Sequence, residues 1–283
     1  ENLVTLDNLS SGFRSAVLHG EFVQGDTGDA ALLRRLLAAH GIETVMHFAA
    51  HIVVPESVAD PLKYYRNNTA NTRTLLECCV AAGVRNFVFS STAAVYGIPA
   101  SGVASEESPT VPINPYGWSK LMSERMLADV AAVNPMRYVA LRYFNVAGAD
   151  PGGRIGQSTP AATHLIKVAC EHATGKRSHV EIYGTDYETP DGTGVRDYIH
   201  VEDLAAAHLK ALDYLRGGGA SSTLNCGYGA GFSVRQVLDQ VASATGQSLR
   251  IVESPRRAGD PAQLVARADR IRERLGWQPR HQD

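Results

Sequence analysis

The feature that most constrains the fold is the alternation of short apolar runs with longer helical patterns in the first half of the chain. Runs typical of strands occur at Leu3–Leu6, Thr44–Phe48, Asn86–Ser90 and Tyr138–Arg142. Helical patterns lie between them at Ala30–His40, Leu62–Ala82 and Tyr116–Val133. The apolar runs are continuous rather than alternating, which is typical of parallel strands buried on both faces, and parallel strands need crossovers of this length. We therefore predict an α/β fold with a doubly wound, Rossmann-like parallel sheet.

The second half of the chain has a less regular pattern. The stretch ADPGGRIGQSTP (149–160) is rich in glycine, proline and polar residues, which is typical of a boundary or a lid. Helical patterns follow near His164–Ala173, Val201–Leu215, Ser233–Thr245 and Asp269–Leu275. Strand-like runs follow near Val180–Tyr183, Asp197–His200, Thr223–Asn225 and Leu249–Val252. We predict one domain over residues 1–145 and a smaller mixed α/β domain over 146–283, with some segments returning to the first.

Composition excludes several classes of partner. The chain has 283 residues, with 27 basic and 29 acidic side chains and a formal charge of −2, so nothing favours binding to nucleic acid or to an anionic membrane surface. No apolar run approaches the ~20 residues of a membrane span. The four cysteines show no CxxC spacing, which predicts no metal site and favours a reducing compartment, the cytoplasm.

Two carboxylates follow strand-like runs and have two interpretations each. Asp7 ends VTLD, and an acidic residue at the end of the second strand of a dinucleotide-binding unit can accept the adenosine ribose hydroxyls. Such a carboxylate repels a 2′-phosphate and therefore favours NAD over NADP. Asp7 could equally satisfy backbone amides of a turn. Asp26, in FVQGDTGD, could face an adenine amino group or cap the helix that begins near Asp29.

Hydroxyl and small side chains end two other strand-like runs. Ser90, Ser91 and Thr92 end the run in FSSTAAVYG (89–97), and ligands of open parallel sheets bind outside the carboxyl ends of the strands. These hydroxyls could bind a substrate oxygen, or they could satisfy backbone groups at the strand end. Small residues in HFAAH (47–51) could admit a ligand or merely permit tight helix packing.

Tyr116 and Lys120 lie four residues apart in NPYGWSK (114–120), at the start of a predicted helix. Residues at this spacing share one helix face. An ammonium group favours the phenolate, and the pKa of tyrosine, ~10, must fall toward neutral for efficient base catalysis. The spacing alone is common on solvated helices, but a cluster of strand-end hydroxyls precedes it, which favours a proton-transfer site.

These features resemble the extended short-chain dehydrogenase/reductase family, and within it the enzymes that act on nucleotide sugars. The resemblance runs nearly from end to end of the chain. Its landmarks are LDNLSSG, HFAA, PESV, YYRNN, FSSTAAVYG, NPYGWSK, LRYFNVAGADP, DGTGVRDYIHV, LNCGYG and RRAGDPAQL. The most specific of them are GTGVRDYIHV and RYFNVAGA.

The resemblance implies an NAD-dependent isomerase that interconverts UDP-glucose and UDP-galactose. Tyr116 would be the base and acid, Lys120 would tune its pKa and anchor a cofactor ribose, and Thr92 would contact the sugar 4-oxygen. Hydride would pass from C4 to tightly held NAD and return to the other face of a rotated 4-keto sugar. The first domain would bind NAD and the second the nucleotide sugar. The helices near 62–82 and 116–133 would form a homodimer.

The resemblance also implies two sets of binding residues. NAD is expected to contact Asp7, Asn8, Asp26, Thr27, Phe48, Ala49, Ala50, Asn67, Ser90, Tyr116, Lys120 and Tyr143. The UDP-sugar is expected to contact Thr92, Asn68, Phe144, Asn145, His164, Leu165, Tyr183, Arg196, Arg257 and Asp260. Two arginines suit a diphosphate because their planar forks bind its oxygens bidentately.

The sequence departs from the family pattern in three places. The first strand and the GxxGxxG loop of the family, whose amides bind a pyrophosphate, are expected before residue 1, so we expect the sequence to be a partial record. The final helix is expected beyond LGWQPRHQD. Ile52 stands where some members of the family have a lysine.

Other activities on the same scaffold stay open. Dehydratases of the family need an additional acid and base, but Ala93 and Ala94 follow Thr92 here and cannot transfer protons. Leu264 stands where some members have a bulky tyrosine next to the sugar 2-substituent, so UDP-N-acetylglucosamine could be a second substrate, and a UDP-pentose is another. A non-catalytic nucleotide-sugar-binding homologue is the alternative from a different class.

Overall fold

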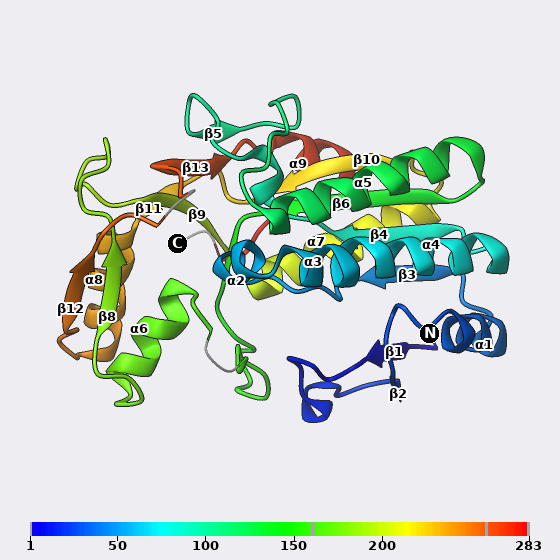
Figure 1. Ribbon diagram of the computed structural model, residues 1–283, viewed down its shortest axis with the longest axis horizontal. Helices are drawn as coiled ribbons and strands as arrows, with labels where there is room; N and C mark the ends of the chain where they lie inside the picture. The colour runs from blue at the N-terminus through cyan, green and yellow to red at the C-terminus, as the bar shows by residue number, and fades with distance from the viewer. Residues whose placement is uncertain (1, 160–161, 258–259, 282–283) are drawn as a thin grey trace.

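A parallel sheet of four strands, in the order β10-β6-β4-β3, forms the centre of the computed structural model (Figure 1). The structure describes residues 2–159, 162–257 and 260–281. The central strands are β3 (Thr44–His47), β4 (Asn86–Ser90), β6 (Arg137–Tyr143) and β10 (Ser222–Cys226). Each pairs with its neighbour in parallel. The predicted α/β fold with a parallel sheet is confirmed.

Helices cover both faces of this sheet, and alternate side chains of its strands pack against them. Phe87 and Phe89 on β4 pack in one cluster with α1, α4 and α5, whereas Val88 packs in a second cluster with α7 and α9. This alternation follows from the two-residue period of a strand. The helices concerned are α1 (Ala30–His40), α4 (Asn71–Ala82), α5 (Pro115–Val133), α7 (Val201–Arg216) and α9 (Asp269–Leu275). Figure 1 shows α4 and α5 in front of the sheet and α7 behind it.

Two strands lie apart from the central sheet. β1 (Val4–Asp7) and β2 (Glu21–Gln24) pair in parallel with each other, and among the described residues neither is hydrogen-bonded to β3. The pair leads into α1, which Asp29 caps by accepting the backbone N–H of Leu32 at 3.0 Å. The helix-capping role that Asp26 could have had therefore belongs to Asp29.

The helix predicted at Leu62–Ala82 is interrupted. It consists of α3 (Pro61–Tyr64), a π-helical segment (Tyr65–Ala70) and α4. A π-helical segment adds a residue to a turn and is frequent at functional sites. It buries Asn68, whose amide accepts from the backbone N–H of His51 at 2.8 Å and donates to the hydroxyl of Ser119 at 3.0 Å. The interruption thereby ties the chain after β3 to α5.

A smaller lobe lies at the other end of the molecule, on the left of Figure 1. Its elements are β8 (Val180–Tyr183), β12 (Ile251–Ser254), α6 (Leu165–Ala173) and α8 (Val234–Thr245). β12 and β8 are parallel, and the two helices pack on them through a separate apolar cluster. Ser233 and Gln236 form a reciprocal capping box that begins α8. β12 begins two residues later than predicted, at Ile251.

A fourth sheet, in the order β11-β9-β13-β5, lies between the lobe and the central sheet, and β7 pairs with β9. Its strands are β5 (Val103–Ala104), β7 (Asn145–Ala147), β9 (Val195–His200), β11 (Gly231–Ser233) and β13 (Gln263–Ala266). Only β9 was predicted, because the others are too short for a periodic pattern. The remaining helical segments are α2 (Val54–Ala59) and the 3₁₀ turns Arg14–Ala16 and Ala93–Tyr96. This fourth sheet joins segments from both halves of the chain, so the domain boundary at residue 145 stays a prediction.

Candidate active site

The hydroxyl-bearing residues that end β4 meet the first turn of α5. Asn114 caps this helix by accepting the backbone N–H of Gly117 at 2.9 Å, and Pro115 occupies its first position. Both residue types are typical of helix starts. The cap fixes where the helix begins and therefore places Tyr116 beside Thr92, with which it forms a side-chain hydrogen bond.

Lys120 lies one turn further along the same buried face. Its side chain is almost inaccessible, and its ammonium group donates to the backbone carbonyl of Ser90 at 2.8 Å. The ammonium also lies 4.9 Å from the ring centroid of Phe89, a cation–π contact. The structure therefore brings together the predicted Tyr116, Lys120 and strand-end hydroxyls.

Burial shifts the ionisation of both groups, in opposite senses for a phenol and an amine. Burial lowers the pKa of Lys120 from 10.5 to about 8, against the opposing charge of Glu124. Burial raises the pKa of Tyr116 well above 10.0, more than its hydrogen bond with Thr92 lowers it. In the protein without a cofactor, desolvation of the phenolate outweighs the hydrogen bond with Thr92. The lowered pKa of Tyr116 therefore stays a prediction for the protein with bound NAD.

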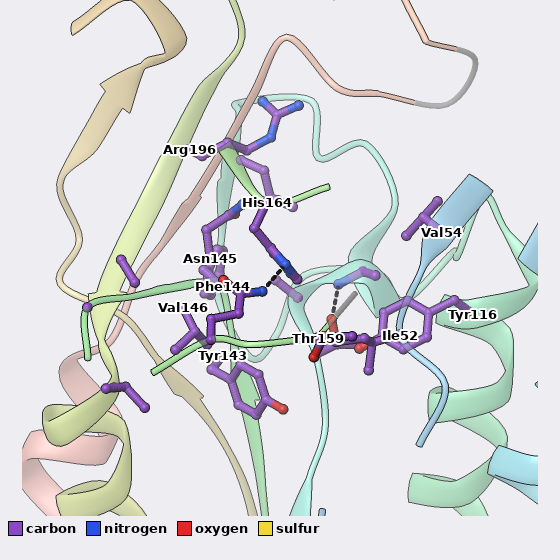
Figure 2. A pocket seen from close by; sticks show the side chains of 18 of the residues that line it. Ile52, Val54, Tyr116, Tyr143, Phe144, Asn145, Val146, Thr159, His164 and Arg196 are labelled. Atoms are coloured by element: carbon purple, nitrogen blue, oxygen red, sulfur yellow. Dashed lines mark hydrogen bonds between the residues drawn. The ribbon is translucent and has the colours of Figure 1, made fainter. Parts of the chain in front are cut away.

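A second tyrosine joins this group from β6. Tyr143 and Ser90 share a hydroxyl–hydroxyl hydrogen bond of 2.6 Å, and burial raises the pKa of Tyr143. Figure 2 shows Tyr116 on one side of a cavity, facing Tyr143, Phe144 and Asn145 across it.

This cavity has a volume of about 720 Å³ and continues into a second one of about 770 Å³. The first is lined by the predicted residues Thr92, Tyr116, Tyr143, Phe144, Asn145, His164, Arg196 and Asp260. The second is lined by the predicted Leu165, Tyr183 and Arg257 and shares Asn145, His164, Arg196 and Asp260 with the first. The tyrosine and lysine thus lie at one end of a long cavity, and the two arginines lie toward the other.

The arginine end combines cations with an aromatic ring. The Arg257 guanidinium carbon lies 3.6 Å from the ring centroid of Tyr183, and Arg196 lies 4.0 Å from a carboxylate oxygen of Asp260. Burial lowers the pKa of His164, so this imidazole is neutral near pH 7 and its Nδ1 can accept from the amide of Gln157, 2.5 Å away. The second cavity therefore presents an anion-binding end with a flat aromatic surface.

Half of the predicted cofactor residues gather elsewhere, at the carboxyl ends of β1, β2 and β3. Asp7, Asn8, Thr27, Ala49, Ala50 and Asn67 line one pocket there. Asp7 Oδ1 accepts the backbone N–H of Leu9 at 2.6 Å. The Asp7 carboxylate therefore stabilises the turn and also lines the pocket. The Asp7 carboxylate can accept hydrogen bonds from the hydroxyls of an adenosine ribose, and the two small alanines let the ribose approach the backbone. The residues of this pocket therefore fit the adenosine half of NAD.

Asp26 is occupied by protein groups. It accepts the backbone N–H of Gly28 at 2.7 Å and the amides of Asn71 and Asn8, both at 2.8 Å. Through Asn8 it braces the loop that carries Asp7. Phe48 is 55% exposed, and its ring lies 4.7 Å from that of His208, whose buried Nε2 has no partner among the described residues.

Asn68 was predicted to contact the substrate, and it is not among the residues that line the two cavities; its contact with the substrate stays a prediction. Asn68 is buried, and its amide binds His51 and Ser119. It therefore supports the site through the backbone after β3 and through α5.

Three further residues gather at the start of α7, where no metal site was predicted. Ligand atoms of His200, Glu202 and His281 lie within 4.8 Å of one another. His200 Nδ1 already accepts the backbone N–H of Glu202 as a helix cap, and its Nε2 lies against Gly148. Glu202 lies 3.0 Å from His281. These contacts account for the group as a helix cap with a close contact between Glu202 and His281.

The buried tyrosine–lysine pair, at the strand ends of a parallel sheet with an adenosine-type pocket, defines a dinucleotide-dependent enzyme of the short-chain dehydrogenase/reductase class. The sequence matches the NAD dependent epimerase/dehydratase family over residues 1–227. The chain belongs to this family.

Among the members of this family, the similar proteins are 4-epimerases of UDP-sugars. The chain is 59% identical to the UDP-glucose 4-epimerase of Azospirillum brasilense over 98% of its own length and 80% of that protein. The UDP-glucose 4-epimerase of Brucella ovis, solved in complex with NAD, superposes with a TM-score of 0.96 at 46% identity, covering 99% of this chain and 86% of that one. The UDP-Glc/GlcNAc 4-epimerase of Campylobacter jejuni superposes with a TM-score of 0.85 at 48% identity, covering 99% and 87%.

Proposed function

We propose that this protein interconverts UDP-glucose and UDP-galactose by 4-epimerisation, with NAD as its cofactor. The observation that carries the proposal is the cavity wall formed by Tyr116 and Thr92, with Lys120 buried directly behind it and two arginines lining the far end. The identity to UDP-glucose 4-epimerases supports it.

The protein groups would carry the proton. The Tyr116 oxygen takes the proton of the sugar 4-hydroxyl and later returns it, while the Thr92 hydroxyl holds the same sugar oxygen in place. Lys120 supplies the positive charge that favours the phenolate. When bound, NAD supplies a hydride acceptor and donor for the sugar carbon. Asp7, Ala49 and Ala50 would hold its adenosine half.

The second cavity would bind the nucleoside diphosphate. Arg196 and Arg257 would bind its phosphate oxygens, and the Tyr183 ring would stack on the uracil once Arg257 moves from its face. Asp260 would accept ribose hydroxyls. Only alanines follow Thr92, at positions 93 and 94, and both line the first cavity. They offer no acid or base for dehydration.

The sugar 2-substituent is the least constrained part of the substrate. Leu264 lines the first cavity, so UDP-N-acetylglucosamine is the second candidate substrate; the Campylobacter relative, named for both sugars, supports it. Turnover of both UDP-sugars by one preparation tests this. Replacement Leu264→Tyr should abolish turnover of the N-acetyl sugar and keep that of UDP-glucose, whereas a wild-type protein inactive on the N-acetyl sugar refutes it.

The central test is a Tyr116→Phe variant of the full-length gene product. It keeps the ring and removes the proton carrier, so epimerisation should fall by at least 10²-fold while UDP binding stays near the wild-type value. Absorbance of copurified NAD(H) separates this proposal from a non-catalytic homologue. A wild-type protein that binds a UDP-sugar and never epimerises it would favour the homologue.

We also propose that the protein is a cytoplasmic homodimer with an NAD-binding domain over residues 1–145. An apolar recess between the π-helical segment and α5 is lined by Tyr65, Thr69, Ala70, Arg73, Met122 and Met126, and Met122 is exposed. A helix of a second copy that covered this recess would remove its apolar surface from water, which favours a dimer.

Cys78, Cys79, Cys170 and Cys226 are free, which suits a reducing compartment. No described helix is long and apolar enough to cross a membrane. Sedimentation of the wild type and of Met122→Glu tests the dimer.

A further inference from the structure

The buried face of α5 continues one turn beyond Lys120. Tyr116, Lys120 and Glu124 follow one another at intervals of four residues, which places them on one helix face. All three are buried. The first two meet the end of β4, as described above. The third also meets it, because Glu124 Oε1 accepts the Ser91 hydroxyl at 2.5 Å. The strand end and the helix are therefore joined at three successive turns.

Glu124 is fully satisfied without any part in the proposed proton transfer. Arg142 on β6 donates to it from Nε at 3.0 Å and from its second terminal nitrogen at 2.6 Å. The remaining terminal nitrogen donates to the hydroxyl of Tyr96 at 3.0 Å. A buried ion pair adds little net stability, since desolvation offsets most of the attraction. Its place one turn from Lys120 therefore suggests a functional role.

We propose that Glu124 is a positioning residue for the epimerisation: its carboxylate keeps Lys120 in the ammonium form and, through Ser91, holds the end of β4 at a fixed distance from α5. The inference rests on the proposed function, because it concerns the same proton-transfer site. Glu124 is not among the residues that line the two cavities or the pocket at the ends of β1, β2 and β3.

The charges around Lys120 support this role. The titratable groups that interact electrostatically with Lys120 are His47 on β3 and Glu124 on α5. Arg142 on β6 is paired with Glu124, and Tyr143 on the same strand and Tyr116 on α5 are both shielded from solvent. Burial and the charge of Lys120 lower the pKa of His47 to about 3, so that imidazole is neutral. Burial lowers the pKa of Lys120, and the charge of Glu124 raises it. Loss of this carboxylate should therefore deprotonate Lys120 at a lower pH.

Three variants separate charge from contact. Glu124→Gln keeps the shape and removes the charge, Glu124→Asp keeps the charge and loses reach, and Ser91→Ala removes only the hydrogen bond. Asp129→Asn is the control, because its carboxylate lies on the same helix, exposed and paired with Arg125. The pH profiles of kcat and KM are measured on the cofactor-loaded full-length enzyme.

In Glu124→Gln, the fall of kcat at high pH, which follows deprotonation of Lys120, should begin about one pH unit lower than in the wild type. At pH values above this fall, kcat should be about tenfold lower than that of the wild type, and KM should change little. Glu124→Asp and Ser91→Ala should lower kcat at every pH and leave the pH at which this fall begins unchanged. Asp129→Asn should match the wild type. A fall that begins at the same pH in Glu124→Gln and the wild type, or identical profiles in the Gln and Asp variants, would overturn the proposal.

A readout without turnover keeps this test separate from the proposed function. The chain has five lysines, so the titration of Lys120 can be followed by NMR of 13Cε-labelled lysine and assigned with Lys120→Arg. Its midpoint should fall in Glu124→Gln and stay in Asp129→Asn; an unmoved midpoint refutes the role even if the enzyme is an epimerase. Should Glu124→Gln not fold, the double variant Glu124→Gln/Arg142→Gln leaves no unpaired buried charge. Its midpoint should fall less than in Glu124→Gln, because the cation of Arg142, which disfavours the ammonium, is removed with the carboxylate; a midpoint that does not fall refutes the role.

Discussion

Replacement of Lys120 by methionine should stabilise the fold while it removes activity. The folded-state pKa of Lys120 is about 8 against 10.5 unperturbed, so the charged amine destabilises the fold at pH 7 by about 3 kcal/mol, at 1.36 kcal/mol per unit. Methionine removes this cost but leaves the Ser90 carbonyl without its donor, which costs about 1–2 kcal/mol. The net expectation is a gain of about 1–2 kcal/mol in the free energy of unfolding.

Urea unfolding at pH 7, with coincident transitions by fluorescence and circular dichroism, measures this gain. Lys210→Met is the matched control, because Lys210 is exposed on α7, and its effect should stay within about 0.5 kcal/mol. The wild type should also gain stability between pH 8 and 10.5, since the unfolded chain binds more protons there. A Lys120→Met variant less stable than the wild type would refute the assignment of Lys120 as a buried charge held at a cost.

Three further substitutions test the contacts of single side chains and one backbone position. Arg142→Met should lower the free energy of unfolding by about 3–5 kcal/mol in urea, because it leaves Glu124 buried and unpaired. The pKa of Asp203 lies below 3.8, since its hydrogen bonds outweigh its burial; its carboxylate therefore stabilises the fold above that pH, and Asp203→Asn should flatten the loss of thermal stability on acidification. Gly97→Ala should lower the melting temperature, because at φ 65° a Cβ would lie 2.1 Å from the Val111 carbonyl oxygen. An unchanged melting temperature there would contradict the backbone assignment.

The sequence predicts long periodic elements well and short paired ones poorly. The bounds of α1 and β4 are confirmed because a cap, a glycine and a continuous apolar run define them. β5 and β13 were not predicted, because their two and four residues gain stability only from each other and from β9. The break at Tyr65–Ala70 was missed because its residues still fit a helical pattern.

The same division holds for the site. Residues on the strand ends and on α5 were predicted from spacing, and the structure brings them together. Glu124 was overlooked, although it continues the interval that links Tyr116 to Lys120. The neutral state of His164 and the contact of Arg257 with Tyr183 depend on packing between segments far apart in the sequence, which no local pattern encodes.

The opposed pKa shifts at the site lead to a general conclusion about how it would operate. Burial raises the pKa of Tyr116 and lowers that of Lys120, so at pH 7 the protein alone favours a neutral phenol beside an amine that is charged but loses its proton more readily than a free lysine. A further positive charge at the cavity wall would lower the pKa of Tyr116, and the cationic nicotinamide of NAD is such a charge. The strength of Tyr116 as a base would then depend on NAD binding. Proton abstraction would therefore be limited to the enzyme with bound NAD. The Glu124 carboxylate keeps Lys120 charged whether or not the cofactor is bound. The nicotinamide cation would thus act on Tyr116, and the carboxylate acts on Lys120.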